Sequence, residues 1–193
     1  MINKYFFETV VVLLSSSMIF SLELKLVHFQ QIMNRESLKL LNTLWSSSIQ
    51  QCLPHRENFA LPQKSMNPHQ YHKGHAVAIL HEMLQQIFNL FRTNLVLGSW
   101  EERHMEKFLI ELYEQLEHLE AALVGLEAEQ KSGTLGTENL RLQVKMYFQR
   151  IHNYLENQKY SSCAWTIVRV EIIRCLFFVF RLTGKLSQYR MDP

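Results

Sequence analysis

The placement of proline and glycine constrains the fold of this chain more than any other feature. Pro54, Pro62 and Pro68 fall in one short stretch, the fourth proline is the last residue, and only 6 glycines occur among 193 residues. A proline inside a helix removes a backbone hydrogen bond and clashes with the preceding turn. Because the remaining segments lack proline, the sequence predicts a mostly helical protein.

Length and charge narrow the class of protein further. A chain of 193 residues, 47% of them apolar, can bury the core of one compact domain. The 20 Lys and Arg residues nearly balance the 18 Asp and Glu residues, giving a formal net charge of +2. This balance argues against a disordered polyelectrolyte, and we expect no nucleic-acid partner.

The first residues have the layout of a secretory signal. Lys4 lies in a polar start, Val10–Leu14 belong to an apolar middle, and a serine-rich end reaches Ser21. We expect residues 1–21 to be a signal peptide and residues 22–193 to be the mature domain. The alternative is that this segment forms a buried N-terminal helix of the domain.

A second apolar run, 167–182, is interrupted by charges. Its charged residues are Arg169, Glu171, Arg174 and Arg181. Four charges exclude a simple transmembrane helix. We therefore expect a secreted, extracellular protein without direct membrane insertion.

Apolar residues recur at helical spacing in five segments. These are about Glu23–Leu44, about His72–Thr93, a third after a capping box of Ser99 and Glu102, a fourth capped by Thr137, and a fifth starting near Ser162. The stripes of the first four are Leu24, Val27, Leu38, Leu41 and Trp45; Leu80, Leu84, Ile87 and Phe91; Leu109, Leu112, Leu116, Leu119, Leu123 and Leu126; and Leu140, Val144, Tyr147, Ile151 and Tyr154. Gly125, Gly133 and Gly136 are interpreted as marking the loop before the fourth segment. The fifth segment is apolar nearly all round, which predicts a central helix.

A long connection, Ser46–Tyr71, separates the first two segments and holds the clustered prolines. Its length favours a functional role. It can also cross the full length of a bundle, so the first two helices can run parallel. The sequence predicts an all-α five-helix bundle with a long first crossover loop, which is typical of helical cytokines.

Three cysteines permit three disulfide pairings in an exported protein. Cys163 and Cys175 lie in one predicted helix, about 18 Å apart along its axis and beyond the ~7 Å limit between bridged Cα atoms. Any bridge within the chain must therefore use Cys52. We favour Cys163 as its partner because it lies at the polar helix start, whereas Cys175 precedes an apolar run and is typical of a buried free thiol.

Motifs of catalysis or cofactor binding are not found in the sequence. His81 begins a partial zinc-protease motif, but Gln85 stands where the second histidine is required. We interpret His69, His72 and His75 as exposed polar residues, because no cysteine or carboxylate near them completes a site. We expect a protein that is not an enzyme and has no metal or other cofactor.

Four segments closely resemble the type I interferons. They are HEMLQQIFNLF (His81–Phe91), EKFLIELYEQLEHLEA (Glu106–Ala121), YFQRI (Tyr147–Ile151) and CAWTIVRVEIIRCL (Cys163–Leu176). Within the family, FSLELKL, SIQQCLPHRENFALPQKS and the count of three cysteines most resemble one subtype. The resemblance implies a cytokine that bridges two receptor chains, activates their associated kinases, and induces antiviral and immunoregulatory genes.

The resemblance also implies two sets of receptor-binding residues. The family engages its higher-affinity receptor chain through positions that match Leu53, Arg56, Arg169, Arg174 and Phe178. It engages its lower-affinity chain through positions that match Phe88, Asn89, Thr93, His104, Leu109, Tyr113 and Lys145. Arg56 and Leu53 are the best supported, since a loop arginine offers five donors and an exposed leucine can fill a pocket.

Several of these residues have a second interpretation. Arg169 and Arg174 can be the solvated edge of a buried helix, and Phe178, Phe88 and Leu109 can belong to the core.

Departures from the family pattern bear on affinity. The second disulfide of many members cannot form, because Ala122 and Leu22 stand at its positions. Lys145, His104 and Leu109 also differ from the residues of several members. We therefore predict weaker binding to at least one receptor chain than the tightest members show.

Other classes stay open at the level of sequence. The chain can be a helical cytokine of another family, a bundle that carries lipid in its core, or a membrane-active bundle that uses its basic end, Arg181–Arg190. We expect a monomer whose partners are the two chains of the type I interferon receptor.

Overall fold

The computed structural model describes residues 2–44, 48–62, 73–95, 100–129 and 134–186. Its elements are α1 (Ile2–Thr43), α2 (Ile49–Cys52), the 3₁₀ helix η1 (Leu53–His55), α3 (Lys73–Thr93), α4 (Glu102–Glu129), α5 (Thr134–Asn157) and α6 (Ser162–Leu186). The described residues form helices and no strand, so the all-α prediction is confirmed.

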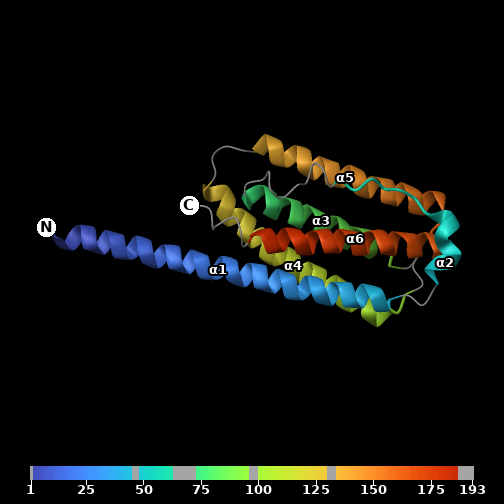
Figure 1. Cartoon of the computed structure of the whole chain (residues 1–193), viewed down its shortest axis with the longest axis horizontal. Helices are drawn as coiled ribbons and strands as arrows, with labels where there is room; N and C mark the ends of the chain where they lie inside the picture. The colour runs from blue at the N-terminus through green and yellow to red at the C-terminus, as the bar shows by residue number, and fades with distance from the viewer. Residues whose placement is uncertain (1, 45–47, 63–72, 96–99, 130–133, 187–193) are drawn as a thin grey trace.

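The long helices pack around α6, as the sequence predicted. α6 contacts α1, α3 and α5, while α4 packs against α1 and α3. Of the 25 residues of α6, 15 are buried. Figure 1 shows α1 and α3 running in the same direction, with α4 and α6 running against them. The long connection between α1 and α3 makes this parallel arrangement possible.

Aromatic side chains form the centre of the core at one end of the bundle. The Trp165 ring lies 4.9 Å from that of Trp100 and 6.0 Å from that of Phe91, between ring centroids. Phe91 also meets Phe108 edge to face at 5.3 Å. Such arrangements stabilise aromatic pairs beyond the area that they bury, and they join α3, α4 and α6.

The predicted apolar stripes of α3 and α5 are buried, whereas Leu109, Leu123 and Leu126 of α4 are half-buried and Leu24 of α1 is 46% exposed. Trp45 lies outside the described residues. The buried positions include Leu80, Leu84, Ile87 and Phe91 of α3, Leu112, Leu116 and Leu119 of α4, and Leu140, Val144, Tyr147, Ile151 and Tyr154 of α5. The spacing of apolar residues at steps of three and four therefore predicted the inward faces of α3, α4 and α5 correctly.

Helix boundaries differ from the prediction at three places. α5 begins at Thr134, so Thr137 is not its cap and Gly136 lies inside it, while Gly125 lies inside α4. An interior glycine costs about 1 kcal/mol relative to alanine, which the buried faces of these long helices outweigh. α1 extends upstream of Glu23 to Ile2. The connection after α1 is also not wholly irregular, because it contains α2 and η1.

Some predictions lie outside the described residues. These concern Ser99 of the capping box, His69, His72, Gly133 and the last residues of the basic end, 187–190.

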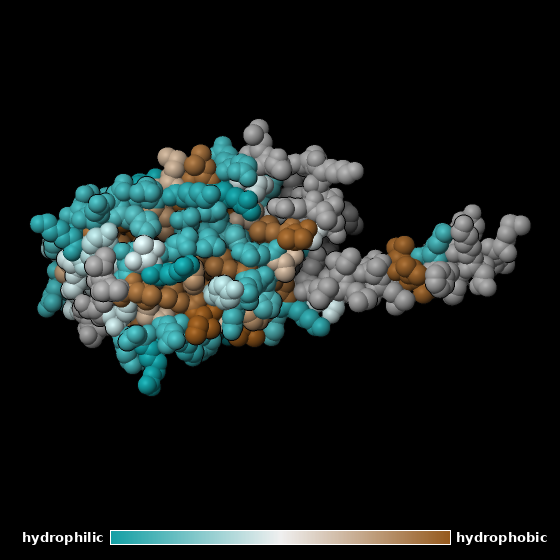
Figure 2. Space-filling model, turned by 180° about the vertical axis from the view of Figure 1, so that it is seen from behind, coloured by the Kyte–Doolittle hydropathy of each residue, from teal (hydrophilic) through white to brown (hydrophobic). Residues whose placement is uncertain are grey.

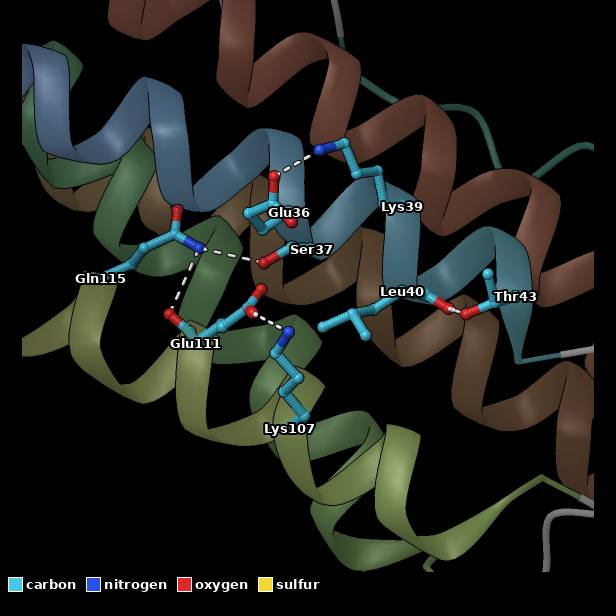
Figure 3. A network of polar contacts seen from close by, with 8 residues as sticks. All are labelled: Glu36, Ser37, Lys39, Leu40, Thr43, Lys107, Glu111 and Gln115. Carbon is cyan, nitrogen blue, oxygen red and sulfur yellow. Dashed lines mark hydrogen bonds and ion pairs between the residues drawn. The ribbon is translucent and has the colours of Figure 1, made fainter.

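Figure 3 shows a polar seam that joins α1 to α4. Gln115 Nε2 donates to Ser37 Oγ at 3.3 Å and to the Glu111 carbonyl at 3.4 Å, and Gln30 Nε2 donates to the Gln115 carbonyl at 2.8 Å. The Glu111 carboxylate, 3.8 Å from Lys107 Nζ, is also part of this seam. Because a buried polar group without a partner is costly, these bonds hold α1 in one register against α4.

Candidate functional site

A disulfide fixes the end of α2 to the start of α6. Cys52 and Cys163 are bonded with their Cα atoms 5.0 Å apart, which is the pairing that the sequence favoured. The remaining cysteine, Cys175, is free and buried, and its Sγ lies 3.2 Å from Tyr147 Oη. Burial raises the pKa of the Cys175 thiol to about 12. It is therefore a packed side chain with little nucleophilic character.

The loop that begins with η1 is exposed over residues 53–58, which include both predicted binding residues. Leu53 is 52% exposed and Arg56 is exposed, whereas Phe59 and Leu61 are buried. The Arg56 amide donates to the Leu53 carbonyl at 3.1 Å, which closes one turn between them. An exposed leucine and an arginine thus project from a turn whose two flanks are anchored in the bundle.

The three α6 positions of the first predicted set lie in different environments. Arg174 is exposed, with Nη1 3.5 Å from Glu171 Oε1. Arg169 is 8% exposed and donates to the Asn42 carbonyl of α1, and burial lowers its pKa. Phe178 is 5% exposed and belongs to the core cluster. For Phe178 the structure thus favours the core interpretation, and it places Arg169 in the contact of α6 with α1.

Two exposed apolar residues of α6 were missed by sequence reasoning. Val170 is 41% exposed and Phe177 is 55% exposed. With Arg174 they follow steps of four and three, so all three lie on one stripe of the helix. Both could have been predicted from the sequence, because they lie four residues before and three residues after Arg174 and so share its face of the helix.

Three residues of the second predicted set, Phe88, Leu109 and Tyr113, line a groove between α3 and α4. The groove has a volume of about 1000 Å³ and is lined by Phe88, Arg92, Leu95, Trp100, Glu102, Glu106, Leu109, Ile110, Tyr113, Glu114 and Glu117. The rings of Phe88 and Tyr113 lie 6.3 Å apart between centroids. Tyr113 is 51% exposed and donates to Glu117 Oε1 at 2.8 Å, a bond that raises the pKa of the phenol.

Two other members of this set extend the same side of α3. Asn89 Oδ1 accepts a hydrogen bond from Gln85 at 3.2 Å, and Thr93 Oγ1 donates to the Asn89 carbonyl at 2.7 Å. Asn89 is half-buried and Thr93 is exposed.

The last two members, His104 and Lys145, each have a carboxylate neighbour. His104 Nδ1 is 2.6 Å from Glu101 Oε2, and Lys145 Nζ of α5 is 3.9 Å from Glu82 Oε2 of α3. A receptor that binds His104 or Lys145 must either displace the neighbouring carboxylate or contact both side chains together.

The described residues also bear on other functions. No group of three or more His, Cys, Asp or Glu side chains among them is placed to hold a metal ion. No helix among them is long and apolar enough to cross a membrane.

Comparison with known proteins decides the family. Residues 26–186 match the family model described as the interferon alpha/beta domain. The chain belongs to the type I interferon family. It is therefore a cytokine. The alternative that it belongs to another helical cytokine family is wrong.

The relatives of this type I interferon include one subtype in three mammals. The chain is 73% identical to interferon epsilon of Sus scrofa over the full length of both proteins. It is 71% identical to interferon epsilon of Homo sapiens over 97% of this chain and 90% of the relative. Identity to the Mus musculus protein is 58% over the full length of both. Epsilon is the subtype that the FSLELKL and SIQQCLPHRENFALPQKS segments resemble.

Family membership also sets the kind of partner. Type I interferons signal by binding two receptor chains at the cell surface, and their family is not one of enzymes.

Proposed function

We propose that this type I interferon is secreted and binds the two chains of its receptor through two separate surfaces. The first receptor surface binds the higher-affinity chain and consists of Leu53, Arg56, Val170, Arg174 and Phe177. The second receptor surface binds the lower-affinity chain and consists of Phe88, Asn89, Thr93, His104, Leu109, Tyr113 and Lys145. Arg169 and Phe178 support the first surface from beneath rather than contact the receptor.

The observation that carries this proposal is the exposure of Leu53 and Arg56 on an anchored turn. An arginine with five donors beside an exposed aliphatic side chain has the composition of a binding hot spot. The disulfide ties this turn to the helix whose stripe carries Phe177. Since η1 also contacts α6, we assign the loop and the exposed stripe of α6 to one surface.

Two surfaces on one rigid bundle explain receptor bridging. Binding to the first chain holds the cytokine at the membrane, which raises the effective concentration of the second chain. The weaker contact then forms after the stronger one. A defect in the first surface should lower the cellular response mainly through this tethering step.

Surface plasmon resonance with each receptor ectodomain tests the assignment. We expect Arg56→Ala to weaken binding to the higher-affinity chain by roughly tenfold or more and to leave the other chain unaffected. Tyr113→Ala should show the reverse pattern. Lys25→Ala, which removes an exposed charge of α1 outside both surfaces, is the control. Normal binding of Arg56→Ala to the higher-affinity chain would refute the role of Arg56.

Absolute affinity provides a second test. Lys145 lacks the forked guanidinium of arginine and lies in an ion pair with Glu82, and His104 has the Glu101 carboxylate as a neighbour. We expect weaker binding to at least one receptor chain than the tightest family members show. Affinities equal to theirs for both chains would contradict this expectation.

The response of cells tests the bridging mechanism and its alternatives together. We expect an interferon-responsive reporter to be silent in cells that lack either receptor chain. A response in either cell line would contradict bridging. Lipid bound to the purified protein, or leakage of receptor-free vesicles, would instead favour a lipid-carrying or membrane-active bundle.

We further propose that residues 1–21 are the secretory signal and that the mature protein, 22–193, is a monomer. The N-terminal part of α1 extends beyond the other helices, and Figure 2 shows apolar atoms on this projection. Val11, Val12 and Leu13 there are 47%, 61% and 68% exposed. Such exposure supports a segment outside the core. Mass spectrometry should find Leu22 at the N-terminus of the secreted protein, and light scattering should give a monomer mass.

A further inference from the structure

Two side chains of α5 bind the backbone of the loop that carries Leu53 and Arg56. Arg150 Nε donates to the Phe59 carbonyl at 2.9 Å, and Arg150 Nη2 donates to the Ala60 carbonyl at 3.2 Å. Tyr154 Oη donates to the His55 carbonyl at 2.7 Å. These bonds join residues separated by 90 or more positions in the sequence.

The contacted carbonyls bracket the exposed part of the loop. Tyr154 holds the residue just before Arg56, and Arg150 holds two residues shortly after it. The Phe59 ring also meets the Tyr154 ring edge to face, with centroids 5.2 Å apart. The loop is thereby held at both sides of Arg56.

The backbone of this loop has little regular structure of its own. η1 contains only three residues, and the residues 56–62 are in no helix. Ala60 has a positive φ of 52°, and its amide donates to Asn58 Oδ1 at 3.0 Å. A loop of this kind without external contacts populates several conformations, which lowers apparent affinity by the fraction that is competent to bind.

We propose that Arg150 and Tyr154 are positioning residues that hold the loop so that Leu53 and Arg56 are presented before the receptor arrives. The inference rests on the proposed role of the first receptor surface. Arg150 and Tyr154 act through the loop backbone and need no contact with the receptor. Their loss should slow association, because binding then waits for the loop to reach the presented conformation.

Two variants with matched controls test this positioning role. Arg150→Ala removes both donated bonds, and Tyr154→Phe removes one hydroxyl while keeping the ring beside Phe59. Arg141→Ala removes the same charge from α5 at a distance from the loop. We expect roughly tenfold weaker binding of Arg150→Ala to the higher-affinity ectodomain, and a smaller loss for Tyr154→Phe. Binding to the lower-affinity ectodomain should be unchanged in all three.

Hydrogen exchange reports on the loop without any receptor. The amides of Arg56 and Ala60 are bonded to the Leu53 carbonyl and to Asn58 Oδ1, so they report on loop order. They should exchange faster in Arg150→Ala while the amides of α3 and α4 are unaffected. Unchanged exchange, or equal loss of affinity for both ectodomains with a lower Tm, would overturn the positioning role.

A double-mutant cycle separates this inference from the proposed function. If Arg150 acts through the loop, Arg56→Ala should cost less affinity in the Arg150→Ala background than in the wild type. Full additivity of the two substitutions would overturn the positioning role. An Arg56→Ala protein that binds as the wild type does would instead refute the proposed contact.

Discussion

Phe177 and Phe178 are adjacent in α6 but lie in opposite environments, since Phe177 is 55% exposed and Phe178 is 5% exposed. Consecutive residues of a helix are rotated by about 100° around its axis. The boundary between the core and the first receptor surface therefore passes between these two rings.

This boundary predicts different effects for the two alanine substitutions. Phe178→Ala should lower the free energy of unfolding by about 3–5 kcal/mol, because it leaves a cavity in the core. Phe177→Ala should change it by no more than about 0.5 kcal/mol and weaken binding to the higher-affinity chain. Urea unfolding and surface plasmon resonance measure the two effects. Similar destabilisation by both substitutions would contradict the boundary.

The backbone at Ala60 predicts a stabilising substitution. Its φ of 52° lies in the left-handed region, which is costly for residues with a Cβ atom. Ala60→Gly should raise the free energy of unfolding by about 0.5–1 kcal/mol. Ala121→Gly, on the exposed side of α4, is the control and should lower it by about 1 kcal/mol. Thermal unfolding of both variants checks the opposite signs.

The sequence predicted the helices that have a clear periodic face and not the contacts that depend on tertiary packing. Leu84 of α3 and Val144 of α5 were placed correctly because the spacing of apolar residues is local information. α6 is apolar nearly all round, so its sequence does not show which side faces outward. Neighbouring residues of a helix point in directions about 100° apart, so Arg169 is buried while the next residue, Val170, is exposed.

The loop contacts were beyond sequence reasoning for a different reason. The bond from Tyr154 to the His55 carbonyl joins residues 99 positions apart, and no local pattern marks a backbone acceptor. The start of α5 was wrong because Gly136 was interpreted as a loop residue. The cost of one glycine is small compared with the packing of a long helix.

The buried carboxylate of Glu111 predicts a dependence of stability on pH. Burial raises its pKa, and Glu36 and Glu114 add to this effect, while Lys107 and the hydroxyl of Ser37 oppose it. Because the folded pKa lies above the reference value of 4.5, the folded state binds the proton more tightly than the unfolded state. This contribution to stability therefore increases as pH falls from neutral through the raised folded pKa toward 4.5.

Glu111→Gln removes this buried charge and should raise the free energy of unfolding at neutral pH. Its advantage over the wild type should shrink as the pH approaches 4.5. Glu106→Gln, at an exposed position of the same helix and not among the groups that shift the pKa of Glu111, is the control and should show no such trend. Urea unfolding across this range measures the difference. An advantage that grew toward acid pH would contradict the sign.

The disulfide predicts that Cys52→Ser impairs folding. The bridge closes a loop of 111 residues, and its loss should cost about 4–5 kcal/mol in the chain-entropy model. Secretion of Cys52→Ser should therefore be low. Cys175→Ser keeps the bridge and should be secreted almost normally, which makes it the matched control. Equal secretion of the two variants would contradict the structural role of the bridge.

The environment of Cys175 predicts a thiol that reacts only on unfolding. Its side chain is fully buried and its pKa is raised to about 12, so at about pH 8 only roughly one molecule in 10⁴ carries the thiolate. Ellman's reagent should leave the folded protein unlabelled and should label one thiol in guanidinium chloride. Cys175→Ser should stay unlabelled in both conditions. Rapid labelling of the folded wild type would show that α5 and α6 separate around this thiol far more often than a packed core allows.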